Sequence, residues 1–145
     1  MPICDGHTII PLFEGFCRKT QVDGLNIIAK IGNHDFKLKV LSTPVSQMKG
    51  YMDSQETPRD GEGMLFVYDR PLPLEFWMKN VPFDLDIIFF DEDRNYIGHQ
   101  TMKAGAGIPD DRLVRYRSNK KAQFAVEVAA GWCDTNLTKD SQLKF

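Results

Sequence analysis

Long apolar runs and a dominant sign of charge are both missing from this sequence of 145 residues. The longest aliphatic or aromatic runs, such as Leu65–Tyr68 and Ile87–Phe90, have only four residues, whereas a membrane-spanning helix needs about 20. The 18 Lys and Arg against 20 Asp and Glu leave a net charge of −2. This balance indicates neither a basic surface for nucleic acid nor a basic anchor for anionic membranes. With 42% hydrophobic residues, general disorder is excluded as well.

Cysteine is scarce, because Cys4, Cys17 and Cys133 are the three in the chain. An odd number cannot pair completely in an oxidising compartment, so we predict reduced thiols. Residues 1–7 have neither the basic segment nor the long apolar segment of a secretory signal. We therefore expect a cytoplasmic protein with no disulfide between Cys133 and the N-terminal cysteines.

Motifs that hold cofactors or metal ions are also lacking. The sequence has no phosphate-binding loop, dinucleotide fingerprint, nucleophile elbow or metalloprotease helix. Cys4, His7 and Cys17 offer three ligands, whereas structural zinc takes four. Cys133 could be a nucleophile assisted by His34 or His99, but a small buried hydrophobic residue explains it equally. We expect no metal and no cofactor.

An acidic turn shows why a calcium loop is not expected. Asp91, Asp93 and Asn95 match the first ligand positions of such a loop. Tyr96 replaces its turn glycine and Met102 its closing glutamate. The segment is more typical of an acidic hairpin turn that binds no calcium.

Alternation of apolar and polar residues predicts several short strands and few helices. Thr43 before Pro44 is typical of a helix N-cap, and a short helical turn is expected after Gly131. The sequence therefore predicts one mainly β domain over residues 24–145, sandwich-like or barrel-like, with residues 1–23 as an extension packed on it. Strands are expected at 25–31, 36–40, 64–68, 74–78, 85–90, 95–102 and 123–129. The predicted core comprises Leu38, Val40, Leu65, Val67, Phe76, Ile87, Phe89, Phe124, Val126 and Val128.

The least ordinary polar residues lie around Trp77. Trp77 and Lys79 share one face of the strand expected there, and an aromatic wall beside a few polar groups is typical of sites for small polar ligands. A core tryptophan beside a solvated lysine would explain the same residues. Asp84 and Asp86 are spaced for acid–base or metal chemistry, but a solvated Asp84 and a structural Asp86 that accepts loop N–H bonds explain them too.

Four successive segments, Gly61–Tyr68, Phe76–Asn80, Leu85–Asp93 and Glu127–Trp132, resemble blocks of the domain of unknown function 192 family. The resemblance implies a compact, mostly β domain with no established activity. Within these segments, the resemblance points to the following residues as candidate functional positions: Trp77, Lys79, Asn80, Asp86, Glu127 and Gly131.

Two departures from the family pattern stand out. Asp53-Ser54 stands where members often have an aromatic residue and an arginine, and Lys139-Asp140 replaces a usual Gly-Asp. Many relatives also carry an export signal.

We expect Lys79, Asn80, Asp86 and Glu127 to form one polar patch, with Lys79 as the cation beside Glu127. With Trp77, this patch would bind a small polar ligand or a partner protein, and neither nucleic acid nor a membrane. A hydrolase that uses Asp86 and Glu127 as acid and base, with Lys79 and Asn80 stabilising negative charge, is a second hypothesis. A purely structural or assembly role is a third.

Overall fold

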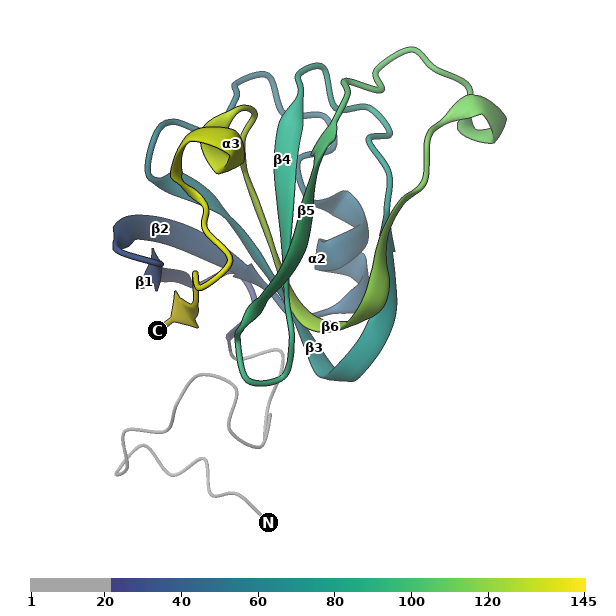
Figure 1. The fold of residues 1–145 in the computed structure, drawn as a ribbon. Coiled ribbons are helices and arrows are strands. Elements are labelled where there is room, and N and C mark those ends of the chain that lie inside the picture. Colours follow the sequence, from purple (N-terminus) through teal and green to yellow (C-terminus); the bar gives the residue numbers. More distant parts are fainter. Residues whose placement is uncertain (1–21) are drawn as a thin grey trace.

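The computed structural model describes residues 22–145, which form one curled β-sheet with short helices on its two sides (Figure 1). The strand order across the sheet is β5-β4-β6-β3-β2-β1-β7. The strands are β1 (Asn26–Ile31), β2 (His34–Leu41), β3 (Glu62–Phe76), β4 (Leu85–Phe90), β5 (Tyr96–Met102), β6 (Tyr116–Ala129) and β7 (Leu143–Lys144). The helices are α2 (Pro44–Lys49), the 3₁₀ turn η1 (Asp110–Arg112) and α3 (Trp132–Asn136).

The mainly β, barrel-like expectation is confirmed. One sheet of seven strands curls on itself, and β2 and β3 are its parallel pair, joined through α2. No helix within residues 22–145 has both the length and the hydrophobicity needed to cross a bilayer.

Each face of the curled sheet carries its own apolar core. Val126 and Val128 of β6 point into one core, together with Cys133 of α3. Phe66 of β3 and Phe89 of β4 point into the other core, which lies on the same face as α2. All ten predicted core residues are buried. Because β4 is buried along its whole length between β5 and β6, its two-sided apolar pattern is explained.

Helix α2 is held by its polar groups rather than by apolar packing. The Thr43 side chain caps the Ser46 amide as predicted, and Gln47 Nε2 donates to the carbonyls of Leu41 and Val67. None of the residues of α2 is buried, and Val45 and Met48 are 82% and 70% exposed. Val45 and Met48, three residues apart on one helical face, therefore point to solvent and not to the core.

The two strands expected at 64–68 and 74–78 are in fact one long strand, β3. Pro71 and Pro73 lie within this strand, although proline cannot donate to a ladder and is rare in a central strand. The pairing of β3 with β6 instead shifts register between Val67 and Leu72 and again between Pro73 and Glu75. Such irregularities tolerate a missing donor, so the strand continues through both prolines.

The expectation that residues 1–23 pack on the domain falls almost entirely outside the described residues, as do Cys4, His7 and Cys17. Asp23 is described and belongs to the domain. Its carboxylate accepts hydrogen bonds from the Ser42 amide (2.8 Å) and the Ser46 hydroxyl (2.6 Å), which ties the segment just before β1 to α2.

Candidate functional site

A small recess lies between α2 and the sheet, and we call it the Glu127 recess. Residues 47–52, from α2 and the turn after it, line one side. The other side is lined by Phe66, Phe76, Trp77, Lys79, Val81 and Glu127. Its volume of about 20 Å³ is enough for one water-sized group. The recess therefore holds three residues singled out from the sequence: Trp77, Lys79 and Glu127.

Two glycines allow the backbone to approach Glu127 closely. At Gly63 on β3, a Cβ atom would overlap the carbonyl oxygen of Glu127, so a side chain there would push β3 and β6 apart. Gly50 ends α2 with a positive φ of 43°, and a Cβ atom there would lie 3.6 Å from Glu127 Oε1. Helix α2 therefore ends at a position where a side chain would be strained.

The side chain of Glu127 is largely buried and has no hydrogen-bond partner within residues 22–145, and its carboxyl oxygens open into the recess, because no fully buried side-chain oxygen or nitrogen of the described residues is left unpaired. The residue is 4% exposed, and no group within residues 22–145 donates a hydrogen bond to its side chain or forms an ion pair with it. Burial disfavours the charged form and raises the pKa of Glu127 to about 8. At neutral pH the group is therefore mainly a neutral carboxylic acid, which can both donate and accept.

Two tyrosines missed by the sequence analysis lie near this carboxyl group. Burial and the charge of Glu127 raise the pKa of both Tyr51 and Tyr68, and Glu62 contributes at Tyr51. Tyr68 could have been found, because it alternates with Phe66 on the face of β3 that carries Glu127's neighbours. Tyr51 follows a helix in a turn, and no local pattern places such a residue.

Lys79 is not the partner of Glu127, so the expectation that it neutralises this carboxylate is wrong. Its Nζ atom pairs instead with Asp110 of η1 at 2.9 Å. It also lies 5.4 Å from the Trp77 ring centroid, and the guanidinium of Arg115 lies 4.3 Å from the same centroid. The indole is therefore contacted by two cations, and the loop that carries Asp110 is fastened beside the recess.

Asp86 lies on the opposite face of the sheet, so the expected patch that joins it to Glu127 is wrong. In the β4–β6 register Asp86 is opposite Val128, whereas Glu127 is opposite Ile87. Because neighbouring positions on a strand point to opposite faces, the two carboxyl groups point away from each other. An acid–base pair of Asp86 and Glu127 acting on one substrate is excluded by this geometry.

Asp86 instead holds α3 on the sheet. Its carboxylate accepts hydrogen bonds from Thr101 Oγ1 (2.8 Å) and from the amides of Gly131 and Cys133 (3.0 Å each). These two amides belong to the first turn of α3 and the residue before it, which lack partners within the helix. Asp86 is therefore a structural residue that accepts loop N–H bonds, as the second explanation from the sequence had it. Gly131 is placed where its amide donates to this carboxylate.

We expect Asp86→Asn to lower the free energy of unfolding by about 2 kcal/mol, because an amide cannot accept all three bonds and a buried donor is left unpaired. Chemical denaturation of the two proteins measures this loss. Hydrogen exchange of the Gly131 and Cys133 amides should accelerate most. Asp93→Asn in the exposed turn is the control, with an expected change below about 0.5 kcal/mol. Equal losses in the two variants would contradict the role of Asp86.

Asn80 and Asp84 act in loops rather than in the recess. Asn80 is exposed with a φ of 56°, and its carbonyl accepts the Asp53 amide at 2.9 Å. Asp84 accepts the Ala104 amide at 2.8 Å, and this bond together with Lys103 lowers its pKa. Asp84 thus fastens the loop that follows β5.

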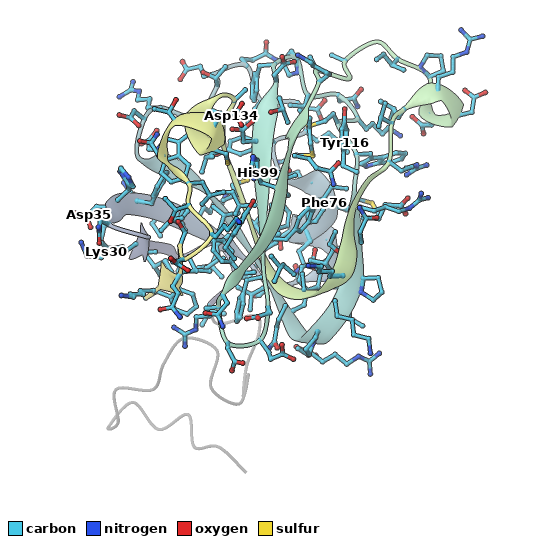
Figure 2. All side chains as sticks on the ribbon, in the orientation of Figure 1. Lys30, Asp35, Phe76, His99, Tyr116 and Asp134 are labelled. Carbon is cyan, nitrogen blue, oxygen red and sulfur yellow. The ribbon has the colours of Figure 1, made fainter. Side chains whose placement is uncertain are left out.

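Cys133 is a buried free thiol on the α3 side. Burial, together with the charge of Asp86, raises its pKa, so it lacks the thiolate character of a nucleophile. His99 contacts Tyr96 (2.6 Å) and Asp134 (3.5 Å) instead. Figure 2 shows His99 and Asp134 next to each other at α3, with Phe76 of the recess on a different strand.

The acidic turn folds as a hairpin connection. Asp91 Oδ1 accepts the amides of Asp93 and Asn95, each at 2.9 Å. The carboxylates of Asp91, Glu92 and Asp93 lie within 4.8 Å of one another, and all of them are accessible to water. The bonds of Asp91 fix the backbone of the turn.

Comparison with known proteins identifies the family. The model of the DUF192 family, described as an uncharacterised ACR family, matches residues 27–145, so the chain belongs to this family. No curated protein matches the chain significantly.

Two crystal structures share the fold. One is a protein of unknown function from Novosphingobium aromaticivorans, with 24% identity over 83% of this chain and 85% of that chain, and a TM-score of 0.72. The other, from Sinorhizobium meliloti, is described as a proposed transcription regulator, with 20% identity over 85% of this chain and 95% of that chain, and a TM-score of 0.72. At these identities the likeness concerns the fold alone.

Proposed function

We propose that this protein is a binding domain for a small polar ligand, and that the Glu127 recess receives one water-sized polar group of it, a hydroxyl or a primary ammonium. A single observation carries the proposal: the largely buried Glu127 opens its carboxyl oxygens into the recess, and no group within residues 22–145 donates a hydrogen bond to them. Buried polar side chains nearly always have a partner. A carboxyl group left without one has a free-energy cost that a ligand would offset.

The surroundings of Glu127 support such a ligand. Phe66, Phe76 and Trp77 line the recess, and such apolar surroundings lower the local dielectric, which strengthens any hydrogen bond formed there. A hydroxyl would bond to the neutral acid. An ammonium group would instead favour the carboxylate, so its binding would release a proton near neutral pH.

An enzyme is the second candidate, and the pKa of Glu127 near 8 is the observation that favours it. A general acid or base works best when its pKa lies near the operating pH. Asp86 lies on the other face, so Glu127 would act without it. In that case Glu127→Gln would keep ligand binding but lose turnover.

Thermal unfolding with a panel of alcohols, polyols, sugars and primary amines tests the binding proposal. A ligand at about 100 times its Kd should stabilise the wild-type protein by about 2.7 kcal/mol. We expect Glu127→Leu to abolish this stabilisation, Glu127→Gln to keep that of hydroxyl ligands and lose that of amines, and the exposed Glu92→Gln to change nothing. Stabilisation that survives Glu127→Leu would contradict the site.

We also propose that the protein binds its ligand in a reducing compartment such as the cytoplasm. The odd number of cysteines and the buried free thiol of Cys133 support this. A disulfide at Cys133 in protein isolated from its source would contradict it.

A further inference from the structure

A second, wider cavity adjoins the Glu127 recess, and we call it the Lys39 cleft. Its volume is about 180 Å³, roughly nine times that of the recess. Its lining residues are Asn26, Lys37, Lys39, Tyr51, Glu62, Gly63 and Met64. Tyr51 lines both cavities, so a molecule in the cleft and a group in the recess would both lie beside this residue.

Lys37 and Lys39 point to the same face of β2, because they are two residues apart on one strand, about 7 Å along it. No carboxylate within residues 22–145 forms an ion pair with either amine. Lys37 has Glu62 opposite it on β3, whereas Lys39 has the uncharged Met64 on one side and Asn26 on the other. Lys39 with the Asn26 amide is therefore the more cationic end of the cleft.

Register places Lys39 and Glu127 on the same face of the sheet. Lys39 is opposite Met64, and Met64 is opposite Glu127. Residues opposite each other on paired strands share a face, and two strand spacings separate their backbones by about 10 Å. One short, flexible ligand can span this distance.

We infer that the ligand carries an anionic group, a phosphate or a carboxylate, which Lys39 binds in the cleft while the hydroxyl or ammonium end enters the Glu127 recess. The inference rests on the proposed function, since it names the second half of the same ligand. Lys37 adds positive charge beside the anion. Asn26 and Tyr51 supply neutral donors, because an amide and an un-ionised phenol both donate hydrogen bonds.

Titration of the full chain with four probes tests this assignment: 5-aminopentyl phosphate, 6-aminohexanoate, pentylamine and inorganic phosphate. Binding is followed by NMR of the backbone amides. We expect the two bifunctional probes to bind at least about tenfold more tightly than pentylamine, with the phosphate ahead of the carboxylate if two lysines share the charge. Amides of β2 and β3 around Lys39 should shift with the anionic probes only.

Variants separate the two ends of the ligand. Lys39→Gln should remove the advantage of 5-aminopentyl phosphate over pentylamine, whereas Lys144→Gln, which removes the same charge from β7 outside the cleft, should keep it. Equal binding of 5-aminopentyl phosphate and pentylamine to the wild-type protein would overturn the inference, as would equal losses in the two lysine variants.

If the proposed function of the Glu127 recess were wrong, the same experiments would give a different result. In that case Glu127→Leu would not weaken any probe, although phosphate would still shift the amides around Lys39. That result would leave an anion site in the cleft and remove the recess from the ligand site.

Discussion

Raising the pH from about 5 to 8 is expected to lower the free energy of unfolding by about 3 to 4 kcal/mol through Glu127 alone. The group has an ordinary pKa of 4.5 in the unfolded chain and a pKa of about 8 in the folded protein. Between these values the folded protein keeps a proton that the unfolded chain has released. Stability therefore falls as pH rises through this window, and the effect of Glu127 levels off about one pH unit above it.

Urea denaturation at several pH values, for the wild-type protein and Glu127→Gln, measures this effect. The variant has no proton to lose, so the difference between the two proteins isolates Glu127 from the histidines and the other carboxylates. At pH 8 we expect Glu127→Gln to be the more stable protein, with the advantage disappearing near pH 5. Glu92→Gln, in the exposed turn, should follow the wild type. Parallel curves for wild type and Glu127→Gln would show that the carboxyl group is ionised or solvated in the folded state.

Replacing Phe89 by alanine is expected to cost about 3–5 kcal/mol. Phe89 is 1% exposed on the central strand β4, and its ring lies 6.0 Å from that of Phe76. Truncation removes buried apolar surface and leaves a cavity that a strand paired on both sides cannot collapse. Because Phe76 lines the Glu127 recess, the loss should also loosen the recess.

Equilibrium denaturation of Phe89→Ala gives the loss directly. Val114→Ala is the matched control, since Val114 is 57% exposed and its truncation should change stability by less than about 0.5 kcal/mol. A loss below about 1 kcal/mol for Phe89→Ala would mean that the ring is not enclosed. The assignment of Phe89 to the α2-side core would then be wrong.

The local elements of the fold follow from short stretches of sequence. Gly32-Asn33 between two alternating segments predicts the β1–β2 hairpin, and Thr43-Pro44 predicts the start of α2. The two-sided apolar run of β4 predicts a strand buried between neighbours. These features depend on residues a few positions apart, where backbone preference and side-chain alternation act directly.

The candidate site was only partly predictable, because its residues come from distant segments. Trp77, Lys79 and Glu127 were singled out and do line one recess. Lys79 was assigned the wrong partner, because Asp110 is brought to it by a loop whose path no local pattern determines. Tyr51 reaches the site through a turn after α2, and nothing in its neighbours indicates this.

The sequence alone determined that this is a mainly β domain of the DUF192 family with Glu127 in a strand of alternating residues. Only the tertiary structure decided that Glu127 and Asp86 face opposite ways. The physical reason is register: side chains alternate with a period of two, so a shift of one residue between β4 and β6 would have placed the two carboxyl groups on one face. The pairing of Asp86 with Val128 instead gives Asp86 the amides at α3 and leaves Glu127 alone beneath α2.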